Sequence, residues 1–212
     1  MLHRFAPALF LLATPLLAQT APPAPSAPAP AATPAPVPAT VKVALETSVG
    51  TIVIAVEVER APITAANFLR YVDQKRLDGT SFYRADPIQP DFGLIQAGTR
   101  NDPKRTLKPI AHEATTKTGL SNTDGAVSMA RNAPGTATGD FFIIVGDMSA
   151  LDAKPDQPGD NQGFAVFGHV VEGMDVVHKI MASPTDPNAG EGAMKGQMLQ
   201  PKIPILHAHR VG

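Results

Sequence analysis

Short runs of alternating apolar residues, separated by glycine and proline, follow one another from Val41 to the end of the chain. The first two runs, in VKVALETSVGTIVIAVEVE, flank Ser48-Val49-Gly50 and predict a β-hairpin. About eight short strands without regular alternation of strand and helix favour an antiparallel barrel or sandwich. Closing a barrel would remove the edge strands. The further predicted strands are 80–85, 93–98, 126–131, 140–146, 164–170 and the final IPILHAHRV.

Two segments change from strand period to helical period. In APITAANFLRYVDQ, Pro62 suits the first turn of a helix. We expect its apolar side chains to face inward and its polar ones to point outward. The inward set is Phe68, Leu69 and Val72, and the outward set is Asn67, Arg70 and Asp73. A second short helix is predicted in GMDVVHKIMAS, with Met174, Val177 and Met181 facing inward.

The N-terminal part of the chain differs from the rest in composition. In MLHRFAPALFLLATPLLAQT, Arg4 precedes an apolar run that ends in small residues near Ala18, which is typical of a secretory signal peptide. The run is shorter than the ~20 residues of a membrane span, although an uncleaved anchor is the alternative. Alanine and proline dominate the next stretch, which we expect to be a disordered spacer. The predicted organisation is a signal peptide (1–18), a linker (19–40) and one folded domain (41–212).

Charge and cysteine content exclude several classes of function. The formal net charge is -1, so no basic surplus attracts nucleic acid. The chain has no cysteine, which excludes disulfides, thiolate catalysis and cysteine-ligated zinc. His207 and His209 have a spacing that can bind zinc, but no third ligand is evident. We expect neither a metal nor a cofactor.

One stretch, SFYRADPIQPDFGLIQAG, places a lone arginine and a lone glutamine among apolar residues. Arg84 lies in the predicted strand 80–85 and Gln96 in the predicted strand 93–98, and neither strand contains an acid. A half-exposed arginine at a strand end is one interpretation. The other is a site that needs a fixed cationic donor, since arginine stays protonated and presents a rigid set of N–H groups.

This stretch and two later segments follow one another in a familiar order: SFYRA followed by GLIQAG, then GAVSMARNAPGTATGDFFI, then FAVFGHVVEGMDVVHKI. With the opening TSVGTIVIAVEVERAPITAANFLRYV, they make the chain resemble a cyclophilin-type peptidyl-prolyl cis-trans isomerase over nearly all of 43–211. The signal-like N-terminus is similar to that of the periplasmic bacterial branch. The resemblance implies a mainly β fold, a closed eight-stranded antiparallel barrel capped by two α-helices. It also implies isomerisation of X-Pro bonds in exported client proteins, which assists their folding.

The resemblance assigns roles to individual residues. Arg84 matches the family's catalytic arginine, and Gln96 matches the glutamine that holds the substrate backbone and orients that arginine. Three apolar residues match the floor of the proline pocket, and two match a strand whose backbone pairs with an extended substrate. The floor residues are Leu94, Phe142 and Leu151, and the pairing residues are Ala130 and Arg131.

The chain departs from the family pattern at four pocket positions. Gly93 stands where a phenylalanine is usual, and Phe92 is the candidate replacement for its ring. Ala150 replaces a tryptophan or phenylalanine, which in the family weakens binding of the cyclic peptide cyclosporin. Phe164 replaces a histidine or tyrosine and keeps only the ring. Asp140 replaces a glutamine, and its carboxylate predicts a preference for basic substrate segments.

Two other functions fit parts of the sequence. The loosened pocket suits a peptide-binding chaperone without catalysis, and the proline-rich arm suits a structural interaction module. We expect the protein to be a periplasmic monomer whose partners are proline-containing segments of client proteins. We expect no nucleic-acid partner and no stable membrane insertion after signal cleavage.

Overall fold

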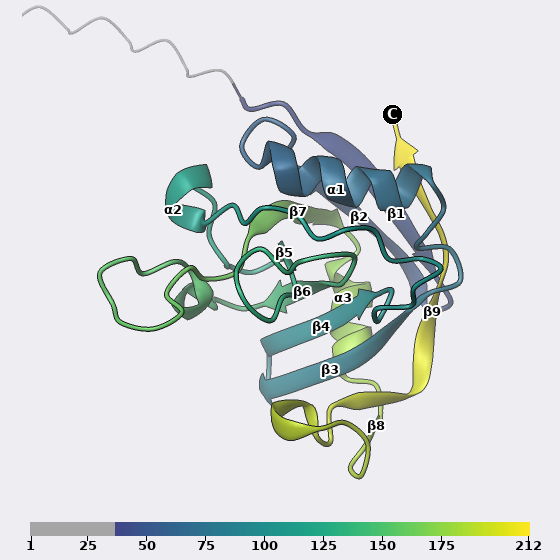
Figure 1. Cartoon of the computed structure of the whole chain (residues 1–212). Coiled ribbons are helices and arrows are strands. Elements are labelled where there is room, and N and C mark those ends of the chain that lie inside the picture. Colours follow the sequence, from purple (N-terminus) through teal and green to yellow (C-terminus); the bar gives the residue numbers. More distant parts are fainter. Residues whose placement is uncertain (1–36) are drawn as a thin grey trace, which may run out of the picture. The chain divides into compact units, whose positions relative to one another are not determined.

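The computed structural model describes residues 37–212, so the predicted signal peptide and most of the predicted linker lie outside the described residues. Within them, eight strands form a closed antiparallel barrel in the order β1-β2-β7-β5-β6-β4-β3-β9, which the pairing of β9 with β1 closes (Figure 1). This confirms the predicted mainly β barrel. The strands are β1 (Val41–Thr47), β2 (Gly50–Val56), β3 (Ser81–Gln89), β4 (Phe92–Gly98), β5 (Ala126–Met129), β6 (Phe141–Val145), β7 (Val166–Glu172) and β9 (Met198–Val211). A two-residue strand, β8 (Thr185–Asp186), pairs with β9 outside the barrel.

The two predicted helices form at the predicted places. Helix α1 (Pro62–Asp73) packs against β7 and β9, and α3 (Met174–Met181) packs against β2, β3, β4 and β6. Shorter turns are α2 (Thr115–Thr118), η1 (Ser149–Leu151) and η2 (Gly192–Met194). No helix in residues 37–212 is long and apolar enough to cross a membrane.

The first hairpin shows how the alternating pattern builds the core. Val43 pairs with Ile54 and Leu45 pairs with Ile52 across β1 and β2. These four side chains are fully buried, because alternate residues of a strand share one face. Burial of each such side chain is worth about 1.5–3 kcal/mol. The repeated inward face therefore supplies much of the drive for closing the barrel.

Helix α1 is fastened to the barrel by aromatic contacts and by one buried amide. The ring of Phe68 meets Phe141 of β6 edge to face, with centroids 5.4 Å apart. The prediction that Asn67 points outward is wrong, because its side chain is buried and its Nδ2 donates a 2.6 Å hydrogen bond to the Thr138 carbonyl. A buried amide needs such a partner. The bond ties α1 to the loop that precedes β6.

The first turn of α1 is capped by a residue distant in sequence. No side chain at the Ala61 N-cap position bonds to the helix. Instead, the buried carboxylate of Glu113 accepts hydrogen bonds from the backbone N–H groups of Ile63 and Thr64, at 3.2 and 2.7 Å, and from the Thr64 hydroxyl at 2.7 Å. The first N–H groups of a helix lack partners within it. Glu113 therefore accepts the hydrogen bonds of backbone N–H groups that an N-cap side chain would otherwise accept.

Two strands are longer than the sequence pattern predicts. Strand β3 runs to Gln89, because its hairpin with β4 continues past Asp86 through the pairing of Pro87 with Gly93. Strand β9 begins at Met198, which pairs with Arg84. The bounds of β5, β6 and β7 differ from prediction by at most two residues. The extensions bring an acid and the start of β9 beside Arg84.

Candidate active site

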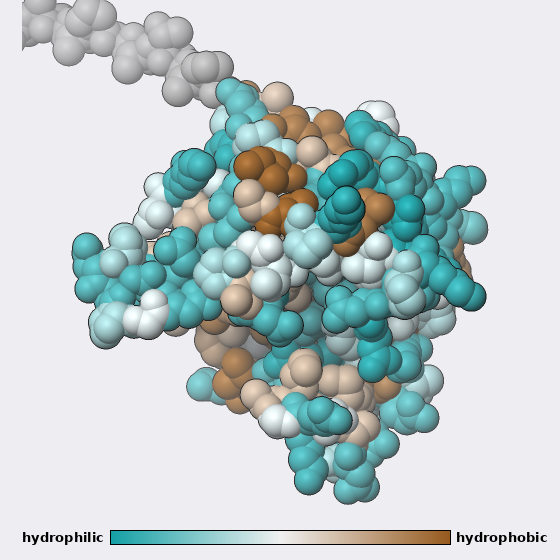
Figure 2. Space-filling model, viewed as in Figure 1, coloured by the Kyte–Doolittle hydropathy of each residue, from teal (hydrophilic) through white to brown (hydrophobic). Residues whose placement is uncertain are grey.

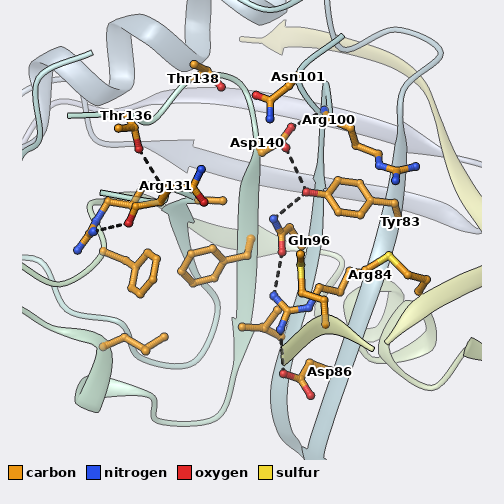
Figure 3. Close-up of a pocket in the computed structure, with 18 of the residues that line it drawn as sticks. Tyr83, Arg84, Asp86, Gln96, Arg100, Asn101, Arg131, Thr136, Thr138 and Asp140 are labelled. Carbon is orange, nitrogen blue, oxygen red and sulfur yellow. Dashed lines mark hydrogen bonds and ion pairs between the residues drawn. The ribbon is translucent and has the colours of Figure 1, made fainter. Parts of the chain in front are cut away.

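A cavity of about 590 Å³ opens beside β3, β4 and β6. The loop after β5, the η1 turn and the segment before β9 complete its wall (Figure 3). Figure 2 shows a face of the folded part on which hydrophilic residues predominate, with smaller hydrophobic areas among them. Nine of the ten predicted site residues line the cavity: Arg84, Gln96, Leu94, Phe142, Leu151, Ala130, Arg131, Phe164 and Asp140.

A bulge in β3 determines which side chains reach the cavity. Phe82 pairs with Ala97 and Arg84 pairs with Gln96, so Tyr83 is an extra residue on β3. In a regular strand Phe82 and Arg84 would share a face. The bulge breaks that alternation, so Phe82 is buried in the core while Tyr83 and Arg84 both line the cavity.

The Arg84 guanidinium is held by three side chains. Its Nη1 donates to Gln96 Oε1 at 3.0 Å, its Nε to Gln197 Oε1 at 2.7 Å and its Nη2 to Asp86 Oδ2 at 3.1 Å. The expectation that Arg84 lacks an acid in its strand is therefore wrong, because β3 extends to include Asp86. The amide of Gln96 holds Arg84 as the resemblance implies.

Gln96 continues the hydrogen-bond network away from Arg84. Its Nε2 donates to the Tyr83 hydroxyl at 2.7 Å, and that hydroxyl donates to Asp140 Oδ2 at 3.2 Å. Burial and the nearby negative charge of Asp140 raise the pKa of Tyr83 well above its ordinary range, so the phenol is neutral. Burial also raises the pKa of Asp140, partly offset by hydrogen bonds from the Arg100 N–H and from Tyr83.

The apolar side of the cavity lies directly beside Gln96. Gln96 pairs with Phe142 across β4 and β6, and Leu94 lies two residues away on the same face. Leu94 and Phe142 are nearly buried, and the Phe142 ring meets Phe164 edge to face with centroids 5.4 Å apart. Together with Leu151 they form an apolar floor next to the guanidinium of Arg84. The apolar floor suits the hydrocarbon ring of a proline, and the cavity of about 590 Å³ has room for it.

Arg131 has a structural role in this wall. Its guanidinium bonds to the Gly163 carbonyl at 2.6 and 2.9 Å and to the Asp160 carboxylate at 2.6 and 3.0 Å. It also lies 5.0 Å from the centre of the Phe164 ring. The side chain therefore fixes the 160–164 loop against the floor. The backbone N–H of Ala130 is bonded to the Asp140 carbonyl at 2.9 Å.

Two of the departures from the family pattern lie outside the cavity. Phe92 does not line it, and its ring packs near Gly146, so it does not replace the ring that Gly93 lacks. A Cβ at residue 93 would lie 2.1 Å from the Asp86 carbonyl oxygen, which explains why glycine is needed there. Ala150 is exposed and borders a second, smaller pocket of about 310 Å³ that shares Leu151 with the cavity.

Sequence reasoning missed several residues of the site. Gln197 and the lining residues Met194 and Met198 come from the segment around the start of β9. That segment has no strand alternation that would have marked it. Tyr83 lies next to Arg84 in the same stretch, but its place in the cavity depends on the bulge, which no local pattern predicts.

The pair of histidines near the C-terminus lies elsewhere. His207 and His209 lie beside Asp78 and Glu46, at 3.5 and 3.9 Å. Among residues 37–212 no group of three or more histidine, cysteine, aspartate or glutamate side chains could hold a metal ion.

The chain is similar to proteins of one family along most of its length. A model of the family described as cyclophilin type peptidyl-prolyl cis-trans isomerase/CLD matches residues 42–210. A peptidyl-prolyl cis-trans isomerase of Acinetobacter baylyi is 42% identical over 147 residues, which cover 68% of this chain and 73% of that protein. The isomerase cyp18 of Streptomyces antibioticus is 42% identical over 167 residues, covering 77% and 93%. Isomerase B of Escherichia coli is 38% identical over 145 residues, covering 68% and 85%.

A solved structure shows the same fold. The cyclophilin-type isomerase of Cryptosporidium parvum, crystallised in the presence of the dipeptide Ala-Pro, aligns with a TM-score of 0.64 at 19% identity, covering 81% of this chain and 99% of that one. The family match and the similarity to the solved structure agree with the closed barrel. The chain belongs to the cyclophilin-type peptidyl-prolyl cis-trans isomerase family and is a peptidyl-prolyl cis-trans isomerase.

Proposed function

We propose that this isomerase accelerates rotation about X-Pro bonds of exported client proteins, with Arg84 as the donor to the prolyl nitrogen. The observation that carries this proposal is the position of the Arg84 guanidinium, which Gln96 and Gln197 hold at the edge of the apolar floor. The prolyl ring would rest on Leu94 and Phe142. Partial double-bond character gives the planar X-Pro amide a barrier of about 18–20 kcal/mol.

The mechanism requires only a well-placed hydrogen bond. When the amide twists, the nitrogen lone pair is no longer shared with the carbonyl and can accept a hydrogen bond. Arg84 therefore binds the twisted state better than either planar state, which is the condition for catalysis. One hydrogen bond to a charged group contributes about 1.5–3 kcal/mol. Since 1.4 kcal/mol is tenfold in rate, Arg84 would supply roughly ten- to hundredfold of the acceleration.

The other parts of the site suit an extended peptide. The loop after β5 would pair with a substrate strand through the carbonyl of Ala130, whose N–H is bonded to Asp140, and through the backbone of Arg131. Asp140 adds a carboxylate to the cavity, which would favour substrates with a basic residue near the proline. Proline-containing segments of newly exported proteins are the substrates that fit these features, and assistance of their folding would follow.

The test compares two arginine variants of the full chain. Arg84→Ala should lower kcat/KM for a short X-Pro peptide at least tenfold, as measured by NMR exchange spectroscopy, without changing the thermal unfolding temperature. Arg60→Ala is the matched control, because Arg60 pairs with Glu57 and does not line the cavity. Wild-type turnover in Arg84→Ala would show that the arginine does not act in the reaction.

The proposed export has a separate test. The apolar run before Ala18 supports cleavage there and release of a soluble protein into the periplasm. Mass spectrometry of the protein from its native host should find an N-terminus in the alanine- and proline-rich segment. An intact Met1 in the membrane fraction would instead establish the uncleaved anchor.

A further inference from the structure

We propose that Asp140 is a positioning residue for the isomerase reaction, which acts through Tyr83 to fix the orientation of the Gln96 amide and so of Arg84. The proposal rests on the proposed role of Arg84 in catalysis. The four side chains form one unbranched series of hydrogen bonds across the cavity wall (Figure 3). None of the three bonds is longer than 3.2 Å.

The direction of every bond in this series follows from its two ends. Arginine can only donate, so the Gln96 atom that faces Arg84 must be the carbonyl oxygen. The amide nitrogen of Gln96 then faces Tyr83 and donates to its hydroxyl oxygen. The single proton of that hydroxyl must find another acceptor. An ionised carboxylate only accepts, and Asp140 Oδ2 is the acceptor in place.

Asp140 is held so that one oxygen faces Tyr83. Its Oδ1 accepts a 2.8 Å hydrogen bond from the Arg100 N–H, and the Arg100 guanidinium lies 5.1 Å from the centre of the Tyr83 ring. The charged and titratable groups around the carboxylate are Arg100 from the loop after β4, Tyr83 from β3 and Tyr71 from α1. The charge of Arg84 acts on Tyr83. No second carboxylate bonds to Tyr83 or Gln96 within residues 37–212.

Neutralising Asp140 reverses one bond of the series. Because Oδ1 faces the Arg100 N–H, an added proton would reside on Oδ2, opposite the Tyr83 hydroxyl. The Tyr83 oxygen would then face two donors, and its own proton would lose its acceptor. The hydroxyl can recover by donating to Gln96, but only if the Gln96 amide turns its nitrogen toward Arg84. In that orientation Gln96 Nε2 would face the N–H groups of Arg84, two donors would oppose each other, and the hydrogen bond between Gln96 and Arg84 would be lost.

The substitution Asp140→Asn makes this reversal permanent at nearly constant shape. The asparagine oxygen would face the Arg100 N–H, and its amide nitrogen would face Tyr83. Burial raises the pKa of Asp140, so wild-type protein should reach the same state as the pH falls, at a higher pH than an exposed aspartate would. A raised native pKa also means that the folded state binds this proton more tightly than the unfolded state, so ionised Asp140 reduces stability at neutral pH. Loss of activity should therefore not be accompanied by loss of stability.

The experiment measures kcat/KM of the full chain for a neutral X-Pro peptide from about pH 8 down to about pH 3.5, which includes the ordinary pKa range of aspartate. Wild type should lose activity on the acid side. Asp140→Asn should be at least threefold less active at neutral pH and at least as stable as wild type. It should also lack the fall in activity at low pH, which we call the acid limb. Asp73→Asn is the matched control, because Asp73 pairs with Arg210 on the surface, and it should keep both the activity and the acid limb.

Further variants separate this proposal from its alternatives. Tyr83→Phe interrupts the series without changing charge and should also lower activity and remove the acid limb. A loss confined to peptides with a basic residue would mean that Asp140 contacts substrate directly, and it would overturn the positioning role. The positioning role would also be overturned if Asp140→Asn had wild-type kcat/KM while Arg84→Ala was impaired. It would likewise be overturned if Asp140→Asn was impaired but less stable than wild type and still lost activity at low pH. Full activity in Arg84→Ala would overturn the proposed function as well.

Discussion

Asp86 Oδ2 lies 3.1 Å from Arg84 Nη2, so the guanidinium at the edge of the apolar floor carries its own counter-ion. The two residues are separated by one position on β3 and both line the cavity. Both side chains remain partly exposed, at 16% and 21%. The pair partly neutralises Arg84 and occupies one donor that a substrate could use.

We predict that Asp86→Asn raises kcat/KM for a short X-Pro peptide by about two- to fivefold. A partly exposed ion pair is worth at most about 1 kcal/mol, which limits the gain. Gln96 and Gln197 still hold the guanidinium, so its orientation should persist. NMR exchange spectroscopy of wild type and variant measures the effect. A threefold or larger decrease would mean that Asp86 itself keeps Arg84 in its productive rotamer.

Gln197 should prove important for turnover although it belongs to no predicted motif. Its Oε1 accepts the 2.7 Å bond from Arg84 Nε, so Gln197→Ala removes one of the supports of the guanidinium. We expect kcat/KM to fall about five- to tenfold, which corresponds to about 1–1.4 kcal/mol. The unfolding temperature should not change. Gln89→Ala, at an exposed end of β3, serves as control. Equal activity of the two variants would contradict a role for Gln197.

The sequence was sufficient for the barrel, and the family resemblance selected side chains that lie together in one cavity. Alternating apolar residues predicted the hairpin of β1 and β2, and the burial of Leu45 and Ile52 confirms it. The pairing of Arg84 with Gln96, and of Gln96 with Phe142, agrees with the residues that the family resemblance selected.

The sequence did not predict the bulge in β3 or the contacts between residues that are distant along the chain, because no local pattern encodes them. The bulge at Tyr83 lets Tyr83 and Arg84 line the same cavity, although simple alternation would put adjacent residues on opposite faces. Gln197 is distant in sequence from Arg84, and Glu113 is similarly distant from Thr64. Such contacts depend on how the closed barrel brings loops together. Asn67 was misplaced for the same reason, because its partner lies on a separate loop.

Removal of the remote cap on α1 should affect stability and spare catalysis. Glu113→Ala would leave the buried N–H of Thr64 and its hydroxyl without their acceptor. We expect a loss of about 2–4 kcal/mol in the free energy of unfolding and a fall of roughly 5 °C or more in the unfolding temperature. The matched control is Glu172→Ala on the surface. Thermal unfolding followed by circular dichroism checks this, and equal stability of both variants would show that the cap is dispensable.

The ion pair between Asp73 and Arg210 gives a pH-dependent contribution to stability. Arg210 donates two hydrogen bonds, of 2.8 and 2.6 Å, and lowers the pKa of Asp73. The native pKa lies below the unfolded value, so the contribution is present above about pH 4 and is lost as pH falls through the native pKa. Both side chains are about half exposed, at 47% and 48%, so it should stay below about 1 kcal/mol.

Denaturant unfolding of wild type and Asp73→Asn checks this sign. The difference in unfolding free energy should favour wild type near neutral pH and shrink as the pH falls through the native pKa of Asp73. A difference that stays constant over the whole range would mean that the substitution acts through packing and not through charge.

The open wall at Ala150 should make the enzyme poorly sensitive to cyclosporin. Ala150 is exposed on η1 and borders the smaller pocket next to Leu151 and Phe164. A missing aromatic side chain removes about 1.5–3 kcal/mol of burial from a bulky ligand, which is tenfold or more in affinity. A single prolyl ring rests on Leu94 and Phe142 and should lose less. We therefore expect weak inhibition of wild type together with measurable turnover.

Ala150→Trp should raise cyclosporin affinity about tenfold or more and change peptide turnover by less than about threefold. Ser149→Trp is the control, because adjacent residues of a 3-10 turn point in directions about 120° apart. Inhibitor titration against the three proteins measures the effect. If wild type were already tightly inhibited, or if both tryptophan variants gained equally, the indole at residue 150 would not be the missing wall. Phe164, whose ring already packs on Phe142, would then be the side chain that closes the pocket.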